Sequence, residues 1–255
     1  MVPTARAYEF YRAETGAPTR WYTDTVEYRL STVAPETIPA AELPGLFDSA
    51  FSAWVDLPGC RTPEIVNVGT TDATARMAPA TVSEPSDNVM VFINDPTVWL
   101  AGGRSSTWIA LTTIALDDVT GELVDTDIEV NDGHYDFATD LTPAAGTPGA
   151  VDLLSALTHE AGHFLGLEHS DVIGATMARA YARGGSGPTD TRTLAQDDID
   201  GACALYEVEK PIIKPKDDDC RGGNGGFSGL LAGLLAALAG LLLRRRRSGY
   251  SASMR

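Results

Sequence analysis

The chain has 255 residues and a formal net charge of −16 at pH 7, because 35 Asp and Glu residues outnumber 19 Lys and Arg residues. This length fits one domain of ordinary size with accessory segments. The excess of acidic side chains argues against a nucleic-acid-binding protein, because phosphates attract basic surfaces. The charge does not decide the fold.

The first half of the chain predicts a sheet with a helix packed on it. Tyr28–Leu30 predicts a first strand, and Pro44 suits the first turn of the helix that follows. Apolar residues at helical spacing are Leu46, Phe47, Ala50, Phe51 and Trp54, and further strand-like runs are Glu64–Val68, Val89–Ile93, Trp108–Leu116 and Leu123–Val130. The pattern predicts five strands and a helix that backs them.

Three of the four histidines lie within eleven residues, 159–169, with the sequence HEAGHFLGLEH. His159 and His163 are four positions apart, so on a helix both imidazoles lie on one face and can bind one metal ion. Gly166 permits the left-handed turn that ends such a helix. That turn brings His169 back as a third ligand and leaves the fourth position of a zinc site for water.

Glu160 directly follows the first of these histidines. It is displaced by about 100° around the helix axis, so its carboxylate can lie beside the metal without binding it. A zinc-bound water molecule needs a general base at this place, to take its proton. The alternative is an amphipathic helix with exposed histidines, since H-E-x-x-H alone recurs by chance. The glycine and the third histidine at fixed spacing favour the metal site.

Residues 159–169 resemble the zinc-binding motif of the metzincin metalloproteases, H-E-x-x-H-x-x-G-x-x-H. Metzincins carry a methionine in a tight turn beneath the zinc, and Met177 matches it by its place after the third histidine. A lone methionine is otherwise usually core filler. Ser170, the residue after the third histidine, resembles the matrixins, which are the matrix-metalloprotease branch.

Residues 194–201 resemble the C-terminal helix of the matrixins. By this resemblance Asp197 supports the methionine turn and Asp198 receives a mature N-terminus. Apart from it, two acids at a helix start simply favour the positive end of the helix dipole. Tyr181 and Arg179 stand where the family lines the pocket for the residue after the cut, so they are candidates for that pocket.

The resemblance covers residues 22–208 and implies an α+β domain of the metzincin type. Such a domain has a five-stranded, mixed, twisted sheet with a backing helix, an active-site helix and a C-terminal helix. It implies a monomeric zinc endopeptidase that acts on proteins or peptides, with Glu160 as general base for a zinc-activated water. The substrate would lie extended and antiparallel to the edge strand near Trp108–Thr113.

The alternative function is a surface adhesion or scaffold module that contains zinc without catalysis. Glu160 argues against it, because a structural site has no use for a base. Structural zinc sites also usually have four protein ligands, and only three are evident in this sequence.

The chain departs from the matrixins at their second, structural zinc. Where the family places a histidine on the strand before the active-site helix, this chain has Glu129, and the remaining histidine is His134. We therefore expect one catalytic zinc and no structural zinc. Oxygen donors in this region either bind calcium or form a solvated acidic turn, and they are Asp127, Glu129, Asn131 and Asp132.

Three cysteines permit one disulfide and one odd thiol. Cys60 and Cys203 both lie in the expected domain, where they are either a disulfide or two separate reduced thiols. Cys220 lies beyond the domain, in a segment of different composition.

The C-terminal region predicts a linker, a membrane span and a basic tail. Residues 209–226 are rich in Pro, Lys, Asp and Gly, and residues 227–243 carry no charge. As a helix the latter segment is roughly 25 Å long, close to the thickness of a bilayer core. Four arginines at 244–247 begin the tail, 244–255, which the positive-inside rule places in the cytoplasm.

This order of segments resembles bacterial C-terminal sorting signals of the myxobacterial or glycine-glycine type. In the first type Cys220 would mark where a processing protease acts. We therefore expect a protein at the bacterial cell surface or secreted, anchored in the membrane until it is processed. Residues 1–21 precede the domain and contain no apolar export signal. Either that signal lies upstream of Met1 in a longer reading frame, or the protein is a tail-anchored cytoplasmic enzyme. A sorting tail makes sense only after export, so we expect the first.

Overall fold

The computed structural model describes residues 8–72, 87–139, 149–179, 191–207 and 247–254. Its main feature is a sheet in which the strands follow the order β2-β1-β3-β5-β4-β8. The strands are β1 (Thr25–Ser31), β2 (Glu64–Thr71), β3 (Asn88–Phe92), β4 (Ala110–Asp117), β5 (Leu123–Val130) and β8 (Arg247–Met254). A separate pair is formed by β6 (Phe137–Ala138) and β7 (Val151–Asp152).

The first five strands form the mixed sheet that the sequence predicts. β2, β1, β3 and β5 are parallel to one another, whereas β4 is antiparallel to β5. β8 adds a sixth strand, which is antiparallel to β4 and pairs along its whole length, from Asp117 opposite Arg247 to Ala110 opposite Met254. The residues of β8 belong to the segment expected as a basic tail, where the sequence pattern predicted no strand.

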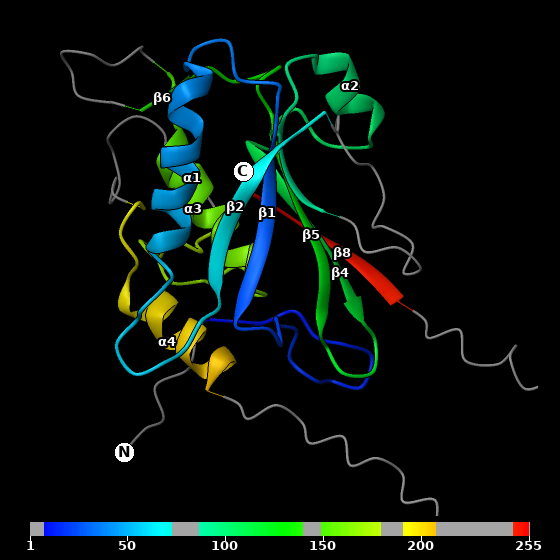
Figure 1. Cartoon of the computed structure of the whole chain (residues 1–255), viewed down its shortest axis with the longest axis vertical. Coiled ribbons are helices and arrows are strands. Elements are labelled where there is room, and N and C mark those ends of the chain that lie inside the picture. The colour runs from blue at the N-terminus through cyan, green and yellow to red at the C-terminus, as the bar shows by residue number, and fades with distance from the viewer. Residues whose placement is uncertain (1–7, 73–86, 140–148, 180–190, 208–246, 255) are drawn as a thin grey trace, which may run out of the picture.

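Two helices lie side by side on one face of the sheet, α1 (Leu43–Ser52) and α3 (Leu153–Phe164) (Figure 1). A 3-10 turn, η1 (Ala40–Glu42), precedes α1, and Pro44 occupies the first turn of α1 as predicted. α4 (Gln196–Tyr206) lies at the lower end of this helical layer in Figure 1. α2 (Pro96–Ala101) was not predicted; the Asp95 carboxylate caps it by accepting from Thr97 N at 2.7 Å.

Aromatic side chains fill the space between these helices and the sheet. The ring centroids of Phe51 lie 5.1 Å from those of both Tyr28 and Phe164, which come from β1 and α3. Trp54 is completely buried, and its Nε1 donates to the carbonyl of Thr158 at 2.9 Å. Burial of such side chains contributes about 1.5–3 kcal/mol each, so α3 is held firmly between α1 and the sheet.

Residues 8–21, which were expected to precede the domain, run along the C-terminal end of α3. Tyr11 N donates to the carbonyl of Gly166 at 3.1 Å, and Glu168 N donates to the carbonyl of Glu9 at 2.9 Å. Trp21 Nε1 donates to the carbonyl of Phe164 at 2.8 Å. This N-terminal segment is therefore part of the same folded unit and covers the loop that follows α3.

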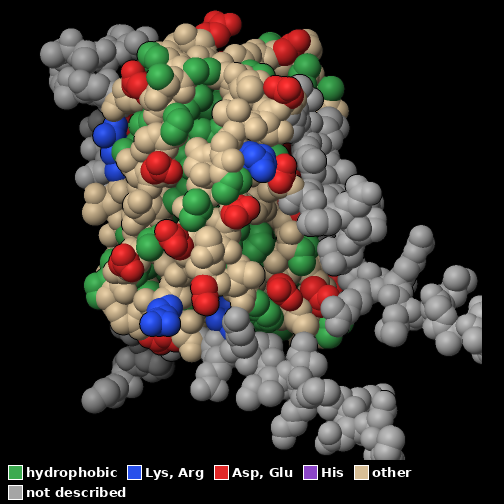
Figure 2. All heavy atoms as spheres, viewed as in Figure 1, with side chains coloured by type: hydrophobic (Ala, Val, Ile, Leu, Met, Phe, Trp, Pro, Cys, Tyr) green, Lys and Arg blue, Asp and Glu red, His purple; other side chains and the backbone are tan. Residues whose placement is uncertain are grey.

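Cys60 and Cys203 form a disulfide that joins the loop after α1 to α4 across 143 residues of sequence. Of the two alternatives left open by the sequence, the structure has the disulfide. Acidic side chains are spread over the face shown in Figure 2, with few basic ones among them, as the net charge predicts.

The C-terminal segments predicted from the sequence lie mostly outside the described residues. These are the linker at 209–226, the membrane span at 227–243 and Cys220. Within the ranges given above, no helix has both the length and the apolar character needed to cross a bilayer.

Candidate metal centre

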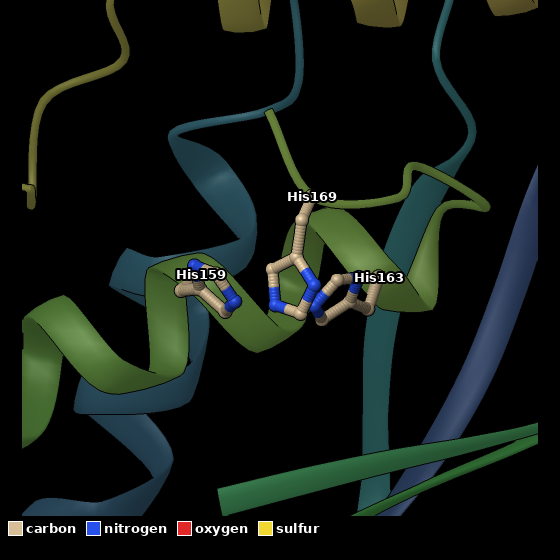
Figure 3. Close-up of side chains that lie close together, drawn as sticks. All are labelled: His159, His163 and His169. Carbon is tan, nitrogen blue, oxygen red and sulfur yellow. The ribbon is translucent and has the colours of Figure 1, made fainter. Parts of the chain in front are cut away.

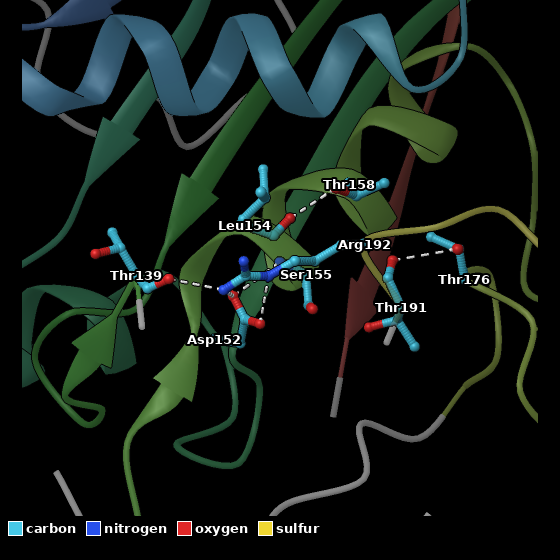
Figure 4. A network of polar contacts seen from close by, with 8 residues as sticks. All are labelled: Thr139, Asp152, Leu154, Ser155, Thr158, Thr176, Thr191 and Arg192. Carbon is cyan, nitrogen blue, oxygen red and sulfur yellow. Dashed lines mark hydrogen bonds and ion pairs between the residues drawn. The ribbon is translucent and has the colours of Figure 1, made fainter. Parts of the chain in front are cut away.

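The start of α3 is fixed by polar contacts (Figure 4). The Asp152 carboxylate accepts from Ser155 N at 3.3 Å and so caps the helix. Arg192 donates to both carboxylate oxygens of Asp152, at 2.7 and 3.0 Å, and to the carbonyl of Thr139 at 2.7 Å. Arg192 thereby ties the segment before α4 to the start of α3. The sequence pattern gave no signal for this pair, because its members lie 40 residues apart.

The three predicted histidine ligands converge (Figure 3). His159 and His163 project from α3, and His169 reaches back from the loop that follows, so that one ligand atom from each lies within 4.8 Å of the others. The first two side chains are completely buried and the third is partly buried. Among the described residues no other group of three His, Cys, Asp or Glu is arranged to hold a metal ion.

Backbone carbonyls orient two of these rings. His159 Nδ1 lies 2.6 Å from the carbonyl oxygen of Thr176, and His163 Nδ1 lies 2.8 Å from that of Leu167. A carbonyl oxygen only accepts, so each Nδ1 carries the proton and each Nε2 keeps its lone pair for a metal. The Nε2 atoms of both residues make no hydrogen bond within the described part of the chain.

Burial also keeps these two histidines neutral. It lowers the pKa of His159 to about 3 and lowers the pKa of His163 well below its usual value, and the neighbouring histidines add to the effect. A histidine must be neutral to bind a metal, and both are neutral at pH 7. Neutral imidazole nitrogens that converge in a buried site suit zinc, which prefers nitrogen ligands in a compact tetrahedral set.

Glu160 is completely buried beside the histidine cluster. The hydroxyl of Thr112, on β4, donates to Glu160 Oε2 at 2.5 Å. The sequence singled out Glu160 but not Thr112, which lies 48 residues earlier in the chain. The contact places the candidate base between α3 and the sheet.

Two glycines shape the motif. Gly166 has φ +103°, as the predicted left-handed turn requires, and a Cβ atom there would lie 2.1 Å from the carbonyl oxygen of Thr19. Gly162 was not singled out from the sequence. A Cβ atom at Gly162 would lie 2.2 Å from Met177 Sδ and 2.8 Å from Trp54 Cζ2, so only glycine fits this close approach.

The methionine turn lies beneath α3 as predicted, but a different carboxylate holds it. Asp198 Oδ2 accepts from Thr176 N at 2.7 Å, and Asp198 Oδ1 accepts from Met177 N at 3.0 Å. The resemblance to the matrixins implied this role for Asp197, which instead accepts from the hydroxyl of Ser170 at 2.6 Å. Successive residues of a helix point about 100° apart, so only one of the two acids faces the turn.

The candidate pocket residues are less well supported. Arg179 is exposed and lies 3.6 Å from the carboxylate of Asp171, as a surface ion pair. Tyr181 lies outside the described residues. The predicted pocket for the residue after the cut therefore stays a prediction.

Glu129, at the position expected for a histidine of the structural zinc site, is buried against Arg104. Arg104 Nε donates to its carboxylate at 3.1 Å, and the guanidinium also stacks 5.2 Å from the ring centre of Trp99. Burial raises the pKa of Glu129 to about 7, although Arg104 opposes this rise.

The other residues considered for calcium contact protein groups as well. Asp127 accepts from Val89 N at 2.8 Å, and Asp132 accepts from Glu36 N at 3.2 Å. Asn131 contacts His134 Nδ1 at 2.9 Å. These side chains contact different partners, and Asp127, Glu129 and Asp132 are not grouped to hold a metal ion.

Comparison with known proteins agrees with the arrangement of this centre. Residues 113–207 match the model of the matrixin family. Human neutrophil collagenase is 38% identical over 84 residues, which cover 33% of this chain and 17% of that protein. Mouse matrilysin is 41% identical over 78 residues, which cover 29% of this chain and 26% of that protein. Soybean metalloendoproteinase 1 is 40% identical over 79 residues, which cover 30% of this chain and 24% of that protein.

The chain thus spans about a quarter or less of the length of these relatives. The matched region contains the three histidines, Glu160, the methionine turn and α4. The metal-binding part of this chain is therefore similar to the matrixins, a family of zinc metalloendopeptidases.

Proposed function

We propose that this chain is a zinc-dependent endopeptidase that cuts extracellular proteins. The observation that carries the proposal is the cluster of His159, His163 and His169, whose ligand atoms lie within 4.8 Å of one another, next to the buried carboxylate of Glu160. When bound, zinc would polarise a peptide carbonyl and lower the pKa of a water molecule. The similarity of residues 113–207 to the matrixins supports the same reaction.

The side chains have separate roles in this proposal. The histidines would hold the ion through neutral ring nitrogens. The carbonyls of Thr176 and Leu167 orient two of the rings by accepting from Nδ1 of His159 and of His163. Glu160 takes a proton from the attacking water and passes it to the leaving amine nitrogen. The buried position of its carboxylate strengthens electrostatic interactions there, because little water screens them.

We also propose that the substrate binds as an extended strand along β4. β8 lies antiparallel on this edge and contacts α3, the helix that carries the metal ligands. A peptide bound by strand addition would make the same type of main-chain hydrogen bonds. β8 and a substrate would therefore compete for one edge of the sheet.

The protein acts, in this proposal, at a bacterial cell surface or after secretion. Residues 227–243 would anchor it, and a processing protease would act near Cys220; the order of linker, uncharged segment and arginines supports this. An anchored chain has residues 247–254 across the membrane from the domain. Anchoring and the pairing of β8 with β4 therefore exclude one another in a single molecule.

The test compares the purified chain with Glu160→Gln on casein and gelatin, each with and without a chelator. We expect digestion that stops with the chelator, returns with added zinc, and is absent in a Glu160→Gln protein that keeps its zinc. If the unaltered chain binds zinc but digests neither protein nor any member of a peptide library, the zinc serves a scaffold module and the proposal is wrong.

A further inference from the structure

Thr112 joins β4 to the candidate base. Its hydroxyl donates to Glu160 Oε2 at 2.5 Å and lies 3.4 Å from the backbone carbonyl oxygen of Glu160. Both side chains are completely buried. The contact spans 48 residues of sequence and two different elements, β4 and α3.

The chemistry of the two groups shows which one donates the hydrogen bond. An ionised carboxylate only accepts, so Thr112 is the donor. A β-branched side chain is restricted at χ1, and Thr112 lies on a strand that pairs with β5, where Ile128 is its partner. The hydroxyl is therefore a fixed point, whereas a glutamate side chain has several rotatable bonds.

A general base must lie within hydrogen-bond reach of the proton it removes. A carboxylate has about four acceptor positions, so a bond from Thr112 to one oxygen leaves capacity for a water molecule. The bond thus restricts where the carboxylate lies without preventing its use. Because Thr112 is on β4, the strand along which an extended peptide would pair, the same strand locates both the peptide and the base.

We propose that Thr112 is a positioning residue that holds the Glu160 carboxylate in its reactive orientation. The proposal rests on the endopeptidase function proposed above. The competing explanation is that Thr112 only fills space between β4 and α3, in which case its hydroxyl is dispensable.

Three variants of the full-length chain separate these explanations. Thr112→Val keeps the shape of the side chain but removes the donor, whereas Thr112→Ser keeps the donor and loses a methyl group. Thr126→Val is the matched control, because Thr126 is also a buried threonine, on β5, and its hydroxyl makes no hydrogen bond within the described residues. Zinc content and thermal midpoint are measured for each variant beside kcat and KM.

We expect Thr112→Val to lower kcat roughly 10- to 100-fold, the scale of a misplaced catalytic group, with KM and zinc content unchanged. Thr112→Ser should recover most of kcat, and Thr126→Val should retain it. Full kcat in Thr112→Val, or an equal loss in Thr112→Ser, would overturn the proposal.

Crystal structures of the metal-free variants give a readout that does not depend on activity. We expect one orientation of the Glu160 carboxylate in the unaltered chain and in Thr112→Ser, and a changed or multiple orientation in Thr112→Val. If the unaltered chain shows no turnover while the carboxylate moves in Thr112→Val, the endopeptidase function is wrong but the positioning contact stands. If the carboxylate keeps its orientation in Thr112→Val, the positioning role is wrong, and the endopeptidase function is unaffected by that result.

Discussion

The carboxylate of Asp198 and the backbone of Met177 are joined by a hydrogen bond of 3.0 Å, and the same carboxylate accepts from Thr176 N at 2.7 Å. The carbonyl of Thr176 in turn lies 2.6 Å from His159 Nδ1. A side chain of α4 therefore holds the peptide unit that orients a metal ligand on α3. Groups of this kind, which bind the ligands rather than the metal, contribute to metal affinity.

Asp198→Asn should weaken zinc binding about 10- to 100-fold, because an amide has one acceptor oxygen and cannot replace both carboxylate contacts. The metal-free protein should also lose about 1–3 kcal/mol of unfolding free energy, as for other buried groups left without a partner. Competition with a fluorescent zinc chelator and urea denaturation measure the two effects. Asp197→Asn is the control, and an equal zinc loss there would show that Asp198 has no special part.

His163→Ala should remove most of the bound zinc, because it deletes one of three nitrogen donors. His134→Ala is the matched control, since His134 contacts Asn131 at 2.9 Å and lies outside the cluster. Metal analysis after dialysis against zinc-free buffer measures the zinc content of both variants. Full zinc occupancy in His163→Ala would mean that the ligand set is wrong.

The metal-free protein should lose stability as the pH falls below about 6.5, the pKa of an unfolded histidine. The folded pKa of His159 is lowered to about 3, so between these values the unfolded chain binds a proton that the folded chain does not. Stability therefore rises with pH in this window, by up to about 1.4 kcal/mol per pH unit for each such histidine.

Urea denaturation of the metal-free chain at pH 7, 6 and 5 measures this slope. Carboxylates also titrate near the lower end of the range, so the comparison is with a His159→Asn, His163→Asn double variant. The double variant should have the smaller slope between pH 7 and 5. Equal slopes would show that the buried histidines do not contribute.

Breaking the disulfide should destabilise the chain by about 2–4 kcal/mol, because Cys60 and Cys203 close a long loop in the unfolded state. The double variant Cys60→Ser, Cys203→Ser should show this loss in chemical denaturation under oxidising conditions. Adding a thiol reductant should destabilise the unaltered chain and leave the double variant unaffected. Equal sensitivity of the two proteins would argue that the bond does not form in solution.

Deleting residues 247–255 from the purified chain should raise kcat/KM toward peptide substrates, because it frees the β4 edge that β8 occupies. A synthetic peptide with the sequence of residues 247–254 should then inhibit peptide cleavage by the shortened chain, and a scrambled peptide should not. If the deletion leaves kcat/KM unchanged and neither peptide inhibits, β8 does not block the substrate edge in solution.

The sequence predicted the parts of the site that are local in the chain. The ligands lie within eleven residues, and helix periodicity alone brings His159 and His163 to one face. Five of the six strands of the main sheet, β1 to β5, and α1 also follow from apolar patterns and one proline. Such features depend on residues near one another in sequence, so pattern analysis finds them.

The remaining features depend on contacts between distant segments. Thr112 meets Glu160 across 48 residues, and Arg104 meets Glu129 across 25. The choice between Asp197 and Asp198 depends on how α4 is rotated against the methionine turn, which the sequence pattern does not determine. β8 was missed because its run of Ser, Gly and Ala lacks the β-branched residues that predict a strand.

Gly162 changes how a mutational scan of this region would be interpreted. It occupies a variable position of the H-E-x-x-H pattern, yet any side chain there would displace Met177 and Trp54 from beneath the helix. Substitutions at Gly162 would disturb the metal centre through packing, with every ligand still present. In a screen that scores activity, this glycine would be indistinguishable from a metal ligand, and only metal analysis combined with a stability measurement would separate the two.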